Sequence, residues 1–479
     1  MAQSLMPHVV IFPFMAQGHT LPLLYLSKAL SIKNIKVTII TTPSNAKFIL
    51  KITDNHPNIH MTEIPFPVID GLPKGCENTS QLPSFDFYVP FLIATKQLQK
   101  PFRQVLQNMS DSKTLPICVI SDFFLGCTLS VCQAFSVPRL VFHGMGVLSM
   151  AICKSSFVHA ANLSSKPISE PLDFPGLNLP FVLTKADLPE VVIKAPDLTD
   201  PYTQFLLEVG EAELNSWGVL VNTFVELERD HVPSLEAFYK YGAGAKAWCV
   251  GPLSLYNNDP NKPNPCSITT KWLDEQAIAP GSVLYVSFGT QADVSDAQLD
   301  EVAFGLESSE NPFIWVVRST TWSPPEGLEE RIKGKGLIVR DWVDQVQILS
   351  HRAVGGFLSH CGWNSILESL SAGLPILAWP MIAEQGLNAR IVVDGFGAGV
   401  GVISSTVINE LGMLSKIGVV SRREICESVK ELMGGDKGRQ SRERAEALGH
   451  VAKEAVREGG SSYRALDELI DQLSGRVVA

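Results

Sequence analysis

The sequence has no long apolar run, no excess of basic residues and no paired cysteine motif. No stretch of about 18 apolar residues occurs, so no membrane-spanning helix is expected. The 39 Lys and Arg are outnumbered by 49 Asp and Glu, and a net charge of −10 lacks the basic footprint of a nucleic-acid binder. The nine cysteines show no Cys-x-x-Cys spacing, which argues against zinc and thioredoxin-like sites. Scattered thiols of this kind predict a cytoplasmic protein.

The chain is long and apolar enough to fold into more than one domain. It has 479 residues, of which 45% are hydrophobic and 18% charged, so a largely disordered protein is excluded. Its length predicts two or three domains. The short apolar run Val9–Phe14 has no Lys or Arg before it, and we interpret it as a first strand and not as a signal peptide.

Strand-like runs alternate with helix-like patterns in the first half of the chain. After Val9–Phe14, the leucines at 23, 26 and 30 follow at helical spacing. Continuous apolar strands between helices indicate a parallel sheet that is covered on both faces. The further strands expected in this half are Lys36–Thr42, Ile59–Ile64, Ile117–Ser121, Arg139–Phe142 and Val219–Asn222.

A second alternation of strands and helices follows a break. Tyr256–Pro265 is polar and rich in proline, with nothing to bury, and we interpret it as an interdomain linker. Ser295 and Gln298 predict a capping box at the start of the next helix. The strands expected here are Ser282–Ser287, Phe313–Val317, Leu337–Val339, Gly356–Ser359, Pro375–Ala378 and Val400–Ile403. The sequence therefore predicts two doubly wound α/β domains, with the ligand site in the cleft between the carboxyl ends of their strands.

The turn His360–Gly362 is a candidate anion site. It leads from a strand into a helix that begins near Trp363, and the free N–H groups of such a helix start attract phosphate. Gly362 lets the backbone approach a ligand closely, and Glu368 lies one turn into the helix, where a carboxylate can accept bonds from ribose hydroxyls. The alternative is a structural turn, with Gly373 and Pro375 ending the helix.

The segment Trp342–Gln385 as a whole resembles the signature box of the plant family 1 UDP-dependent glycosyltransferases in length and in the spacing of its polar and aromatic residues. The resemblance extends over the whole chain, through Phe14–His19, Ser287–Thr290, Phe313–Arg318 and a tail at Gly459–Ser462 followed by Leu466–Leu473. The donor-binding residues that it implies are Thr290, Trp342, Val343, Gln345, His360, Gly362, Trp363, Asn364, Ser365, Glu368, Glu384 and Gln385.

The resemblance also implies what these residues do. Trp342 would stack on uracil, with Val343 and Gln345 reading the uracil and ribose. His360, Asn364 and Ser365 would hold the phosphates, with Thr290 on a second phosphate-contacting turn, and Glu368 would bind the ribose hydroxyls. Glu384 and Gln385 would bind the sugar, and a final Gln favours glucose over galactose.

Two positions depart from the pattern of the family. Asp344 stands where the family usually has Pro, and we expect it to alter the local turn more than the chemistry. Glu384 stands where the family usually has Asp, and its extra methylene puts the choice of sugar in doubt.

His19 and Asp122 are the candidate catalytic pair. His19 follows the first strand, and an imidazole with an ordinary pKa of about 6.5 can accept a proton at neutral pH. Asp122 follows the strand Ile117–Ser121, and the ends of adjacent strands could bring the two together. Taken singly, a lone His is more often structural and Asp122 could cap a helix. The resemblance implies a His base oriented by such an Asp.

The resemblance thus implies a GT-B fold of two Rossmann-like domains that face a central cleft. The N-terminal acceptor-binding domain would span residues 1–252 with a returning C-terminal helix at about 460–479, and the UDP-sugar-binding domain 253–459. Position near strand ends and loops suggests an acceptor entrance lined by Phe14, Phe85, Phe87, Phe123 and Met145, although core packing explains each of these residues equally well.

The expected activity is inverting transfer of glucose from UDP-glucose to a hydroxyl of a small lipophilic plant metabolite, such as a flavonoid, another phenolic or a terpenoid, giving a β-glucoside. The alternatives are a transferase that extends a glycoside or forms a C-glycoside, and a nucleotide-sugar-binding protein without turnover. UDP-glucose would be a co-substrate, with no cofactor, and the protein a monomer. Because no Asp-x-Asp motif occurs, no metal is expected.

Two further segments resemble a dinucleotide-binding loop and a pair of catalytic carboxylates, but we assign neither function to them. Gly395–Gly401 is rich in glycine but does not fit the dinucleotide fingerprint, and we interpret it as a tight turn into a strand. Glu226 and Glu228 resemble paired catalytic carboxylates, but a solvated helix start explains them better, since negative charge there suits the helix dipole.

Overall fold

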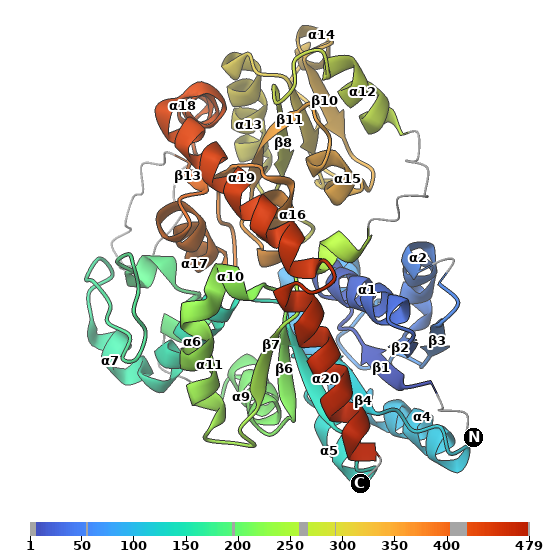
Figure 1. Ribbon diagram of the computed structural model, residues 1–479. Coiled ribbons are helices and arrows are strands. Elements are labelled where there is room, and N and C mark those ends of the chain that lie inside the picture. Colours follow the sequence, from blue (N-terminus) through green and yellow to red (C-terminus); the bar gives the residue numbers. More distant parts are fainter. Residues whose placement is uncertain are drawn as a thin grey trace. The chain divides into compact units, whose positions relative to one another are not determined.

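The computed structural model describes residues 6–53, 56–193, 197–257, 267–292, 294–402 and 419–477. They form two compact units, each described by itself below (Figure 1). The first unit comprises Met1–Ala151, Pro196–Asp259 and Glu454–Ala479, and the second Ile152–Ala195 and Pro260–Lys453.

The first unit is built on a seven-stranded parallel sheet with the order β3-β2-β1-β4-β5-β6-β7. Four of its central strands are buried along their whole length, which is the pattern of a sheet covered by helices on both faces. The strands are β1 (His8–Phe12), β2 (Lys36–Thr41), β3 (Ile59–Glu63), β4 (Cys118–Asp122), β5 (Arg139–His143), β6 (Gly218–Val221) and β7 (Lys246–Cys249).

Helices pack on this sheet through two apolar clusters. One cluster joins Val9 and Ile11 of β1 to the leucines of the first helix, and the other joins Val10 and Phe12, on the opposite face, to Phe102 and its neighbours. The helices are α1 (Gln17–Ile32), α2 (Pro43–Thr53), α3 (Tyr88–Lys96), α4 (Gln99–Asp111), α5 (Thr128–Ala134), α9 (Pro201–Leu214), α10 (Val225–Glu228), α11 (Val232–Tyr239) and α20 (Ser461–Val477), with α6 (Val147–Val158) leading into the second unit.

The second unit repeats this topology with six parallel strands in the order β10-β9-β8-β11-β12-β13. The strands are β8 (Val283–Ser287), β9 (Phe313–Val316), β10 (Gly336–Val339), β11 (Val354–Ser359), β12 (Ile376–Ala378) and β13 (Gly399–Gly401). The helices are α7 (Ala160–Ser165), α8 (Glu190–Ile193), α12 (Ile268–Gln276), α13 (Asp296–Ser309), α14 (Leu328–Arg331), α15 (Gln345–Leu349), α16 (Trp363–Ala372), α17 (Gln385–Arg390), α18 (Arg422–Gly434) and the greater part of α19 (Asp436–Val456).

The two parallel sheets confirm the predicted doubly wound α/β class, since each strand order turns back at the first strand of its unit. The expected strands are present with ends shifted by one or two residues, and β7 is a strand that the sequence did not reveal. The last helix, α20, packs on β7 and adds Leu466, Leu469 and Leu473 to the core of the first unit. The assignment of acceptor and donor to the two domains stays a prediction.

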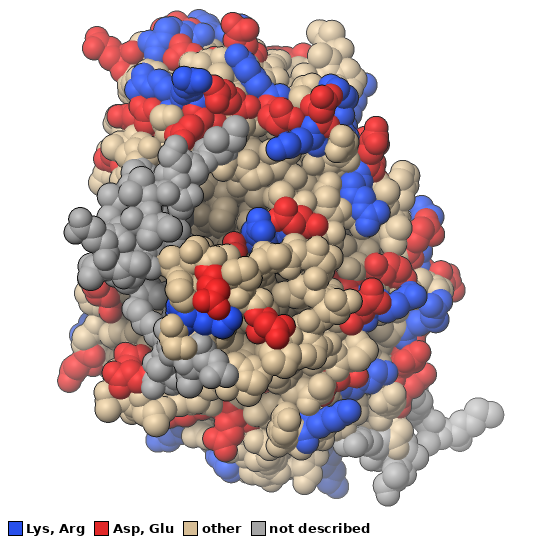
Figure 2. Space-filling model, turned by 90° about the vertical axis from the view of Figure 1, so that its left-hand side faces the viewer, with Lys and Arg blue, Asp and Glu red and all other residues tan. Residues whose placement is uncertain are grey.

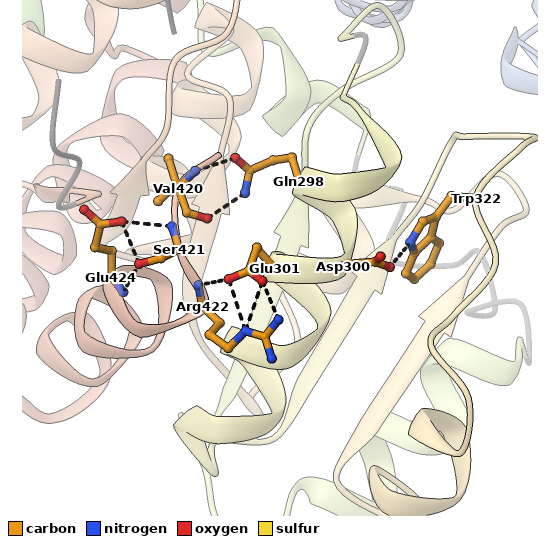
Figure 3. A network of polar contacts seen from close by, with 8 residues as sticks. All are labelled: Gln298, Asp300, Glu301, Trp322, Val420, Ser421, Arg422 and Glu424. Carbon is orange, nitrogen blue, oxygen red and sulfur yellow. Dashed lines mark hydrogen bonds and ion pairs between the residues drawn. The ribbon is translucent and has the colours of Figure 1, made fainter. Parts of the chain in front are cut away.

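The predicted capping box at Ser295 is half right. The Ser295 hydroxyl accepts from the Gln298 N–H at 3.3 Å, but the Gln298 side chain does not return to Ser295. Its amide donates to the Val420 carbonyl at 3.0 Å and accepts from the Val420 N–H at 2.8 Å (Figure 3). A full capping box forms instead at Ser421 and Glu424, where α18 begins. Gln298 thus joins α13 to the start of α18.

The interpretation of Glu226 and Glu228 as a solvated helix start is wrong for Glu228. Glu226 is exposed and accepts from the Ser461 hydroxyl at 2.8 Å. Glu228 is only 1% exposed, and its two carboxylate oxygens accept from the N–H groups of Val147 at 3.1 Å and Leu148 at 2.9 Å. The carboxylate therefore satisfies the first N–H groups of α6, which have no partner within their own helix.

The start of the expected linker is also more buried than predicted. Tyr256 is partly buried against the core of the first unit, where residues 253–257 form a short 3₁₀ helix. Residues 258–265 of the expected linker lie outside the described residues. Gly397 has a positive φ of 66° and precedes β13, so the glycine-rich segment does turn into a strand as expected, although Ile403 lies outside the described residues.

No helix in the described parts of the chain is both long and apolar enough to cross a membrane. On the face shown in Figure 2, Lys and Arg side chains lie among Asp and Glu side chains, so this face presents a mixed charge to solvent.

We expect Glu228→Gln to lower the free energy of unfolding by about 1–3 kcal/mol, because the new amide NH₂ would face a backbone N–H that now donates to a carboxylate oxygen. Urea denaturation followed by circular dichroism measures this loss. Glu226→Gln is the matched control and should change the stability by about 0.5 kcal/mol or less, since Glu226 is exposed. Equal effects of the two substitutions would contradict the role given to Glu228.

Candidate active site

His19 and Asp122 meet at the carboxyl edge of the first sheet. Strands β1 and β4 are neighbours, so the segments that follow them leave the sheet side by side. His19 Nδ1 lies 2.8 Å from Asp122 Oδ2, although the two residues are 103 positions apart in the chain. The His19 side chain is 28% exposed and that of Asp122 is fully buried. His19 follows the first strand as expected, and it lies in the first turn of α1, which begins at Gln17.

The loop after β4 fixes both members of this pair. The other carboxylate oxygen of Asp122, Oδ1, accepts from the Phe124 N–H at 3.0 Å. The Phe124 ring lies 5.4 Å from the His19 ring and 5.1 Å from that of Phe14, measured between centroids. Gly144 also lies near the ring, since a Cβ there would be 3.9 Å from His19 Cε1. The imidazole is thus held by a charged partner and by aromatic walls.

The predicted acceptor residues fall into different environments. Phe14 is buried in the core beneath His19, while Phe85 is 73% exposed and stacks on Tyr88 with centroids 5.0 Å apart. Phe87, Phe123 and Met145 are partly buried. A pocket of about 260 Å³ in the same unit involves none of these five, and its lining residues are Lys96, Gln99, Phe124, Gly126, Cys127, Phe205, Glu208 and Val209. Phe124 is thus a wall of this pocket as well as a neighbour of His19.

A second polar constellation lies at the carboxyl edge of the other sheet, where β8 and β11 pair as neighbours. The His360 ring lies between two glycines: a Cβ at Gly289 would lie 2.8 Å from His360 Nε2, and one at Gly362 only 2.6 Å away. The ring keeps some exposure to solvent, but desolvation by the surrounding protein lowers its pKa to about 4. His360 is therefore neutral at pH 7.

Backbone geometry in this turn is unusual. Cys361 has a positive φ of 64°, a conformation that side chains rarely adopt outside special turns. Its N–H donates to the Ser359 hydroxyl at 3.1 Å, and its carbonyl accepts from the buried amide of Asn388 at 3.0 Å. These bonds hold the turn in place, and α16 begins two residues later, with Gly362 at its N-cap. The helix start that the sequence predicted is present.

Gln345 is bonded to two other predicted donor-binding residues. Its amide nitrogen donates to the Ser365 hydroxyl at 2.9 Å and to Glu368 Oε2 at 2.7 Å. Its amide oxygen accepts from the hydroxyl of Tyr285 at 3.2 Å. Burial raises the pKa of Glu368 to about 7, with a smaller contribution from the negative charge of Asp344, while the bond from Gln345 opposes the shift. Glu368 therefore changes its charge close to neutral pH.

Asp344, which replaces the usual proline, caps a helix. Its side chain accepts from the Gln347 N–H at 3.1 Å and so begins α15 directly before Gln345. Trp342 is 38% exposed, and Val343 packs partly buried against the core of the unit. The cap accounts for the expected change of the turn, and the charge of Asp344 also acts on Glu368.

The remaining predicted donor-binding residues differ in their exposure to solvent. Trp363 is only 2% exposed and belongs to the core, whereas Thr290 is exposed and Asn364 partly buried. The oxygen of Gln385 accepts from the N–H groups of Met381 at 3.0 Å and Ile382 at 2.9 Å, so it stabilises its own turn.

Glu384 lies next to Gln385 and accepts from Asn388 at 3.3 Å.

A sequence family described as UDP-glucoronosyl and UDP-glucosyl transferase matches residues 253–422. UDP-glycosyltransferase 73B4 of Arabidopsis thaliana is 37% identical over 500 residues, covering 98% of this chain and 99% of that protein. UDP-glycosyltransferase 90A1 of the same plant is 40% identical over 482 residues, covering 97% and 96%. The chain belongs to the plant UDP-glycosyltransferase family.

Solved structures of the family agree with this. Glycyrrhiza uralensis UGT73P12, complexed with glycyrrhetinic acid 3-O-monoglucuronide, superimposes with a TM-score of 0.84 at 30% identity, covering 98% of this chain and 96% of that one. Phytolacca americana UGT2, complexed with UDP-2fluoro-glucose and pterostilbene, gives 0.77 at 28% identity, covering 98% and 100%. The chain is thus a UDP-glycosyltransferase of the GT-B class that uses a UDP-sugar donor and acts on small plant metabolites.

Several residues of these sites were missed by sequence reasoning. Phe124 and Tyr285 look like ordinary strand or loop aromatics, and only the fold shows that they touch His19 and Gln345. Gly289 was part of a recognised turn, but its contact with His360 was not foreseen. The glycine itself was the available signal, because glycine often marks a backbone position with positive φ. Gly289 has a φ of 78°.

We expect Gly289→Ala to weaken UDP binding by on the order of tenfold or more, because the new Cβ would displace the His360 ring. Isothermal titration calorimetry with UDP measures the loss. Gly334→Ala is the control for backbone strain, since Gly334 has the same φ of 78° but nothing within 4 Å of its Cβ position. A similar loss of affinity in both variants would show that strain alone, and not the crowding of His360, is responsible.

Proposed function

We propose that this UDP-glycosyltransferase transfers glucose from UDP-glucose to a hydroxyl of a small lipophilic plant metabolite, a flavonoid, another phenolic or a terpenoid, with inversion to the β-glucoside. The observation that carries the proposal is the 2.8 Å contact between His19 Nδ1 and the buried carboxylate of Asp122. A partly exposed imidazole paired in this way is suited to remove a proton from an acceptor hydroxyl.

The geometry of the pair supports a defined tautomer. Because Asp122 is an acceptor, the proton of the neutral ring belongs on Nδ1, and the basic electron pair is then on Nε2. Nε2 would take the proton of the acceptor hydroxyl as its oxygen bonds to the anomeric carbon. The Asp122 carboxylate would stabilise the imidazolium that results.

The donor would be held by the second unit. Trp342 would stack on uracil, and Glu368 would accept bonds from the ribose hydroxyls, with Gln345 already bonded to its carboxylate. The N-terminus of α16, with Asn364 and Ser365 in its first turn, and His360 in the preceding turn would face the diphosphate.

The bond that breaks joins the anomeric carbon to the diphosphate, whose oxygen leaves with the electron pair. Preorganised N–H donors at the helix start would stabilise that charge. Attack from the opposite face would convert the α-linked donor into a β-glycoside.

Glucose is supported as the sugar by the Gln385 position and by the UDP-2fluoro-glucose bound to Phytolacca americana UGT2. Glu384, in place of the usual Asp, is the residue whose longer side chain bears on this choice. A second activity, extension of an existing glycoside, is supported by the monoglucuronide bound to Glycyrrhiza uralensis UGT73P12. A cytoplasmic location remains part of this proposal.

The decisive experiment offers UDP-glucose with a panel of flavonoids, simple phenols, terpenoid alcohols and their monoglycosides. Products are identified by mass spectrometry and UDP release is measured in parallel. The proposal expects an acceptor-dependent gain of one hexose on the aglycones. A gain only on the monoglycosides would favour the extending activity, and faster transfer from another UDP-sugar would overturn glucose as the donor.

We expect His19→Ala to lower kcat for hydroxyl acceptors by about 10²–10⁴-fold, because the general base is lost. UDP affinity should remain within about twofold, since His19 and the donor box belong to different units. Asp122→Asn should also lower kcat strongly, because an amide cannot stabilise the imidazolium. Single-turnover assays at saturating substrate measure the loss of rate in the two variants. Full activity of His19→Ala would refute the assignment of the base.

We expect the affinity for UDP-glucose to fall roughly tenfold between pH 8 and pH 6. Glu368, whose pKa is raised to about 7, is ionised above this pH and becomes protonated below it, where it accepts hydrogen bonds from ribose hydroxyls less well. The diphosphate of UDP-glucose does not titrate in this range. Calorimetric titrations at several pH values test the expectation.

Two variants control the assignment to Glu368. Glu368→Gln should bind UDP-glucose weakly at every pH, without the transition. Asp344→Asn should move the transition to lower pH, because one negative charge that raises the pKa of Glu368 is removed. An unchanged transition in Glu368→Gln would show that another group titrates.

A further inference from the structure

Arg139 is a buried arginine behind the His19–Asp122 pair. It is the first residue of β5 and only 2% exposed. Its Nε lies 2.8 Å from both the Ser121 hydroxyl and the Thr128 hydroxyl, and Nη1 donates to the Ser216 hydroxyl at 2.7 Å. Such a complete set of partners is what a buried guanidinium requires.

The guanidinium is also bound to the loop that carries Asp122. Nη2 donates to the carbonyl of Asp122 at 3.4 Å and to that of Leu125 at 3.3 Å. Phe124 lies between these two residues, donates its N–H to the Asp122 carboxylate and packs its ring on His19. Nη1 also donates to the Ala212 carbonyl of α9 at 3.4 Å. The Arg139 side chain therefore connects this loop to a helix that is distant in the sequence.

The charges around Arg139 are few and can be named. Burial lowers its pKa to about 10, so it remains protonated at neutral pH, where Asp122 and Glu213 attract it. Glu213 lies on α9 and accepts from the Tyr239 hydroxyl at 2.7 Å. Cys127 and Cys132 are the other titratable groups near the guanidinium, and burial raises the pKa of Cys127 to about 11 and that of Cys132 to about 12, so neither is ionised.

We propose that Arg139 is a positioning residue for the catalytic pair: its buried guanidinium fixes the loop that aims Asp122 at His19, and its positive charge opposes protonation of His19. The inference rests on the proposed function only in so far as His19 acts as the base. The coupling between Arg139 and His19 can be measured without turnover.

The sign of the electrostatic effect follows from the charges. A cation near the pair disfavours the positively charged imidazolium, so the loss of that cation should make His19 easier to protonate. The titration midpoint of His19 should therefore move to higher pH when Arg139 is replaced by a neutral residue. A purely mechanical role would lower activity without moving that midpoint.

The test compares Arg139→Gln, which removes the charge but keeps an amide donor, with Arg139→Lys, which keeps the charge but loses the planar fork. The full-length protein is labelled with ¹³C at its ten histidines and titrated by NMR, with the His19 signal assigned from its loss in His19→Gln. The pH profile of kcat is measured in parallel. Arg103→Gln, an exposed substitution on α4, is the matched control.

We expect Arg139→Gln to raise the His19 midpoint by ~0.5 pH unit or more and to move the acidic limb of kcat by the same amount. Arg139→Lys should leave the midpoint in place while lowering kcat, because the loop is held by fewer bonds. Thr128→Val removes one acceptor of the guanidinium without a change of charge, and should likewise lower kcat only. Arg103→Gln should change neither quantity.

An unmoved His19 midpoint in folded Arg139→Gln would overturn the electrostatic part of the proposal, and full kcat in Thr128→Val and Arg139→Lys would overturn the mechanical part. If Arg139→Gln does not fold, the latter two variants decide the mechanical part, and a moved His19 midpoint in Arg139→Lys, which keeps the charge, would overturn the electrostatic part. Failure of the proposed function looks different: His19→Ala would stay active while the NMR midpoint still followed the charge at position 139.

Discussion

The protein depends on one constraint of parallel sheets: adjacent strands end at the same edge, so residues far apart in the chain become neighbours there. In the first unit, the pairing of β1 with β4 brings His19 to Asp122. In the second unit, the pairing of β8 with β11 brings the turn containing Gly289 against His360. Both constellations follow from the same strand order, which turns back at the first strand of each unit.

Buried polar groups then refine these positions. Arg139, Glu228 and Asn388 are each removed from solvent, and each is satisfied by several oxygen or N–H partners. A buried group of this kind tolerates few arrangements, because a lost partner is not replaced by water. The three side chains stabilise, respectively, the loop after β4, the start of α6 and the turn before α16. The chemistry at the surface of each unit is thus supported by polar contacts beneath it.

Much of the fold could be predicted from sequence because the strands are apolar along their length and the helices keep their period. The His360 turn and its helix were also visible, since a strand, a short turn with glycine and a helix follow one another locally. What failed was non-local. Glu228 looked like any acidic helix start, and only α6, about 80 residues earlier in the chain, explains its burial. Gln298 matched a local capping pattern but paired with Val420 instead. Arg139 was only the first residue of an expected strand, because no local pattern reveals that its side chain is buried among hydroxyl groups from distant parts of the chain.

The position of His360 between two glycines has a consequence for the evolution of the chain. Residues 289, 360 and 362 share one small volume, so none of them can change size independently. A smaller side chain at position 360 would leave room for a side chain at positions 289 and 362. A residue larger than glycine at either of those positions would require a smaller side chain at position 360. Among relatives, the three positions should therefore covary as a single unit, although two of them are more than 70 positions from the first.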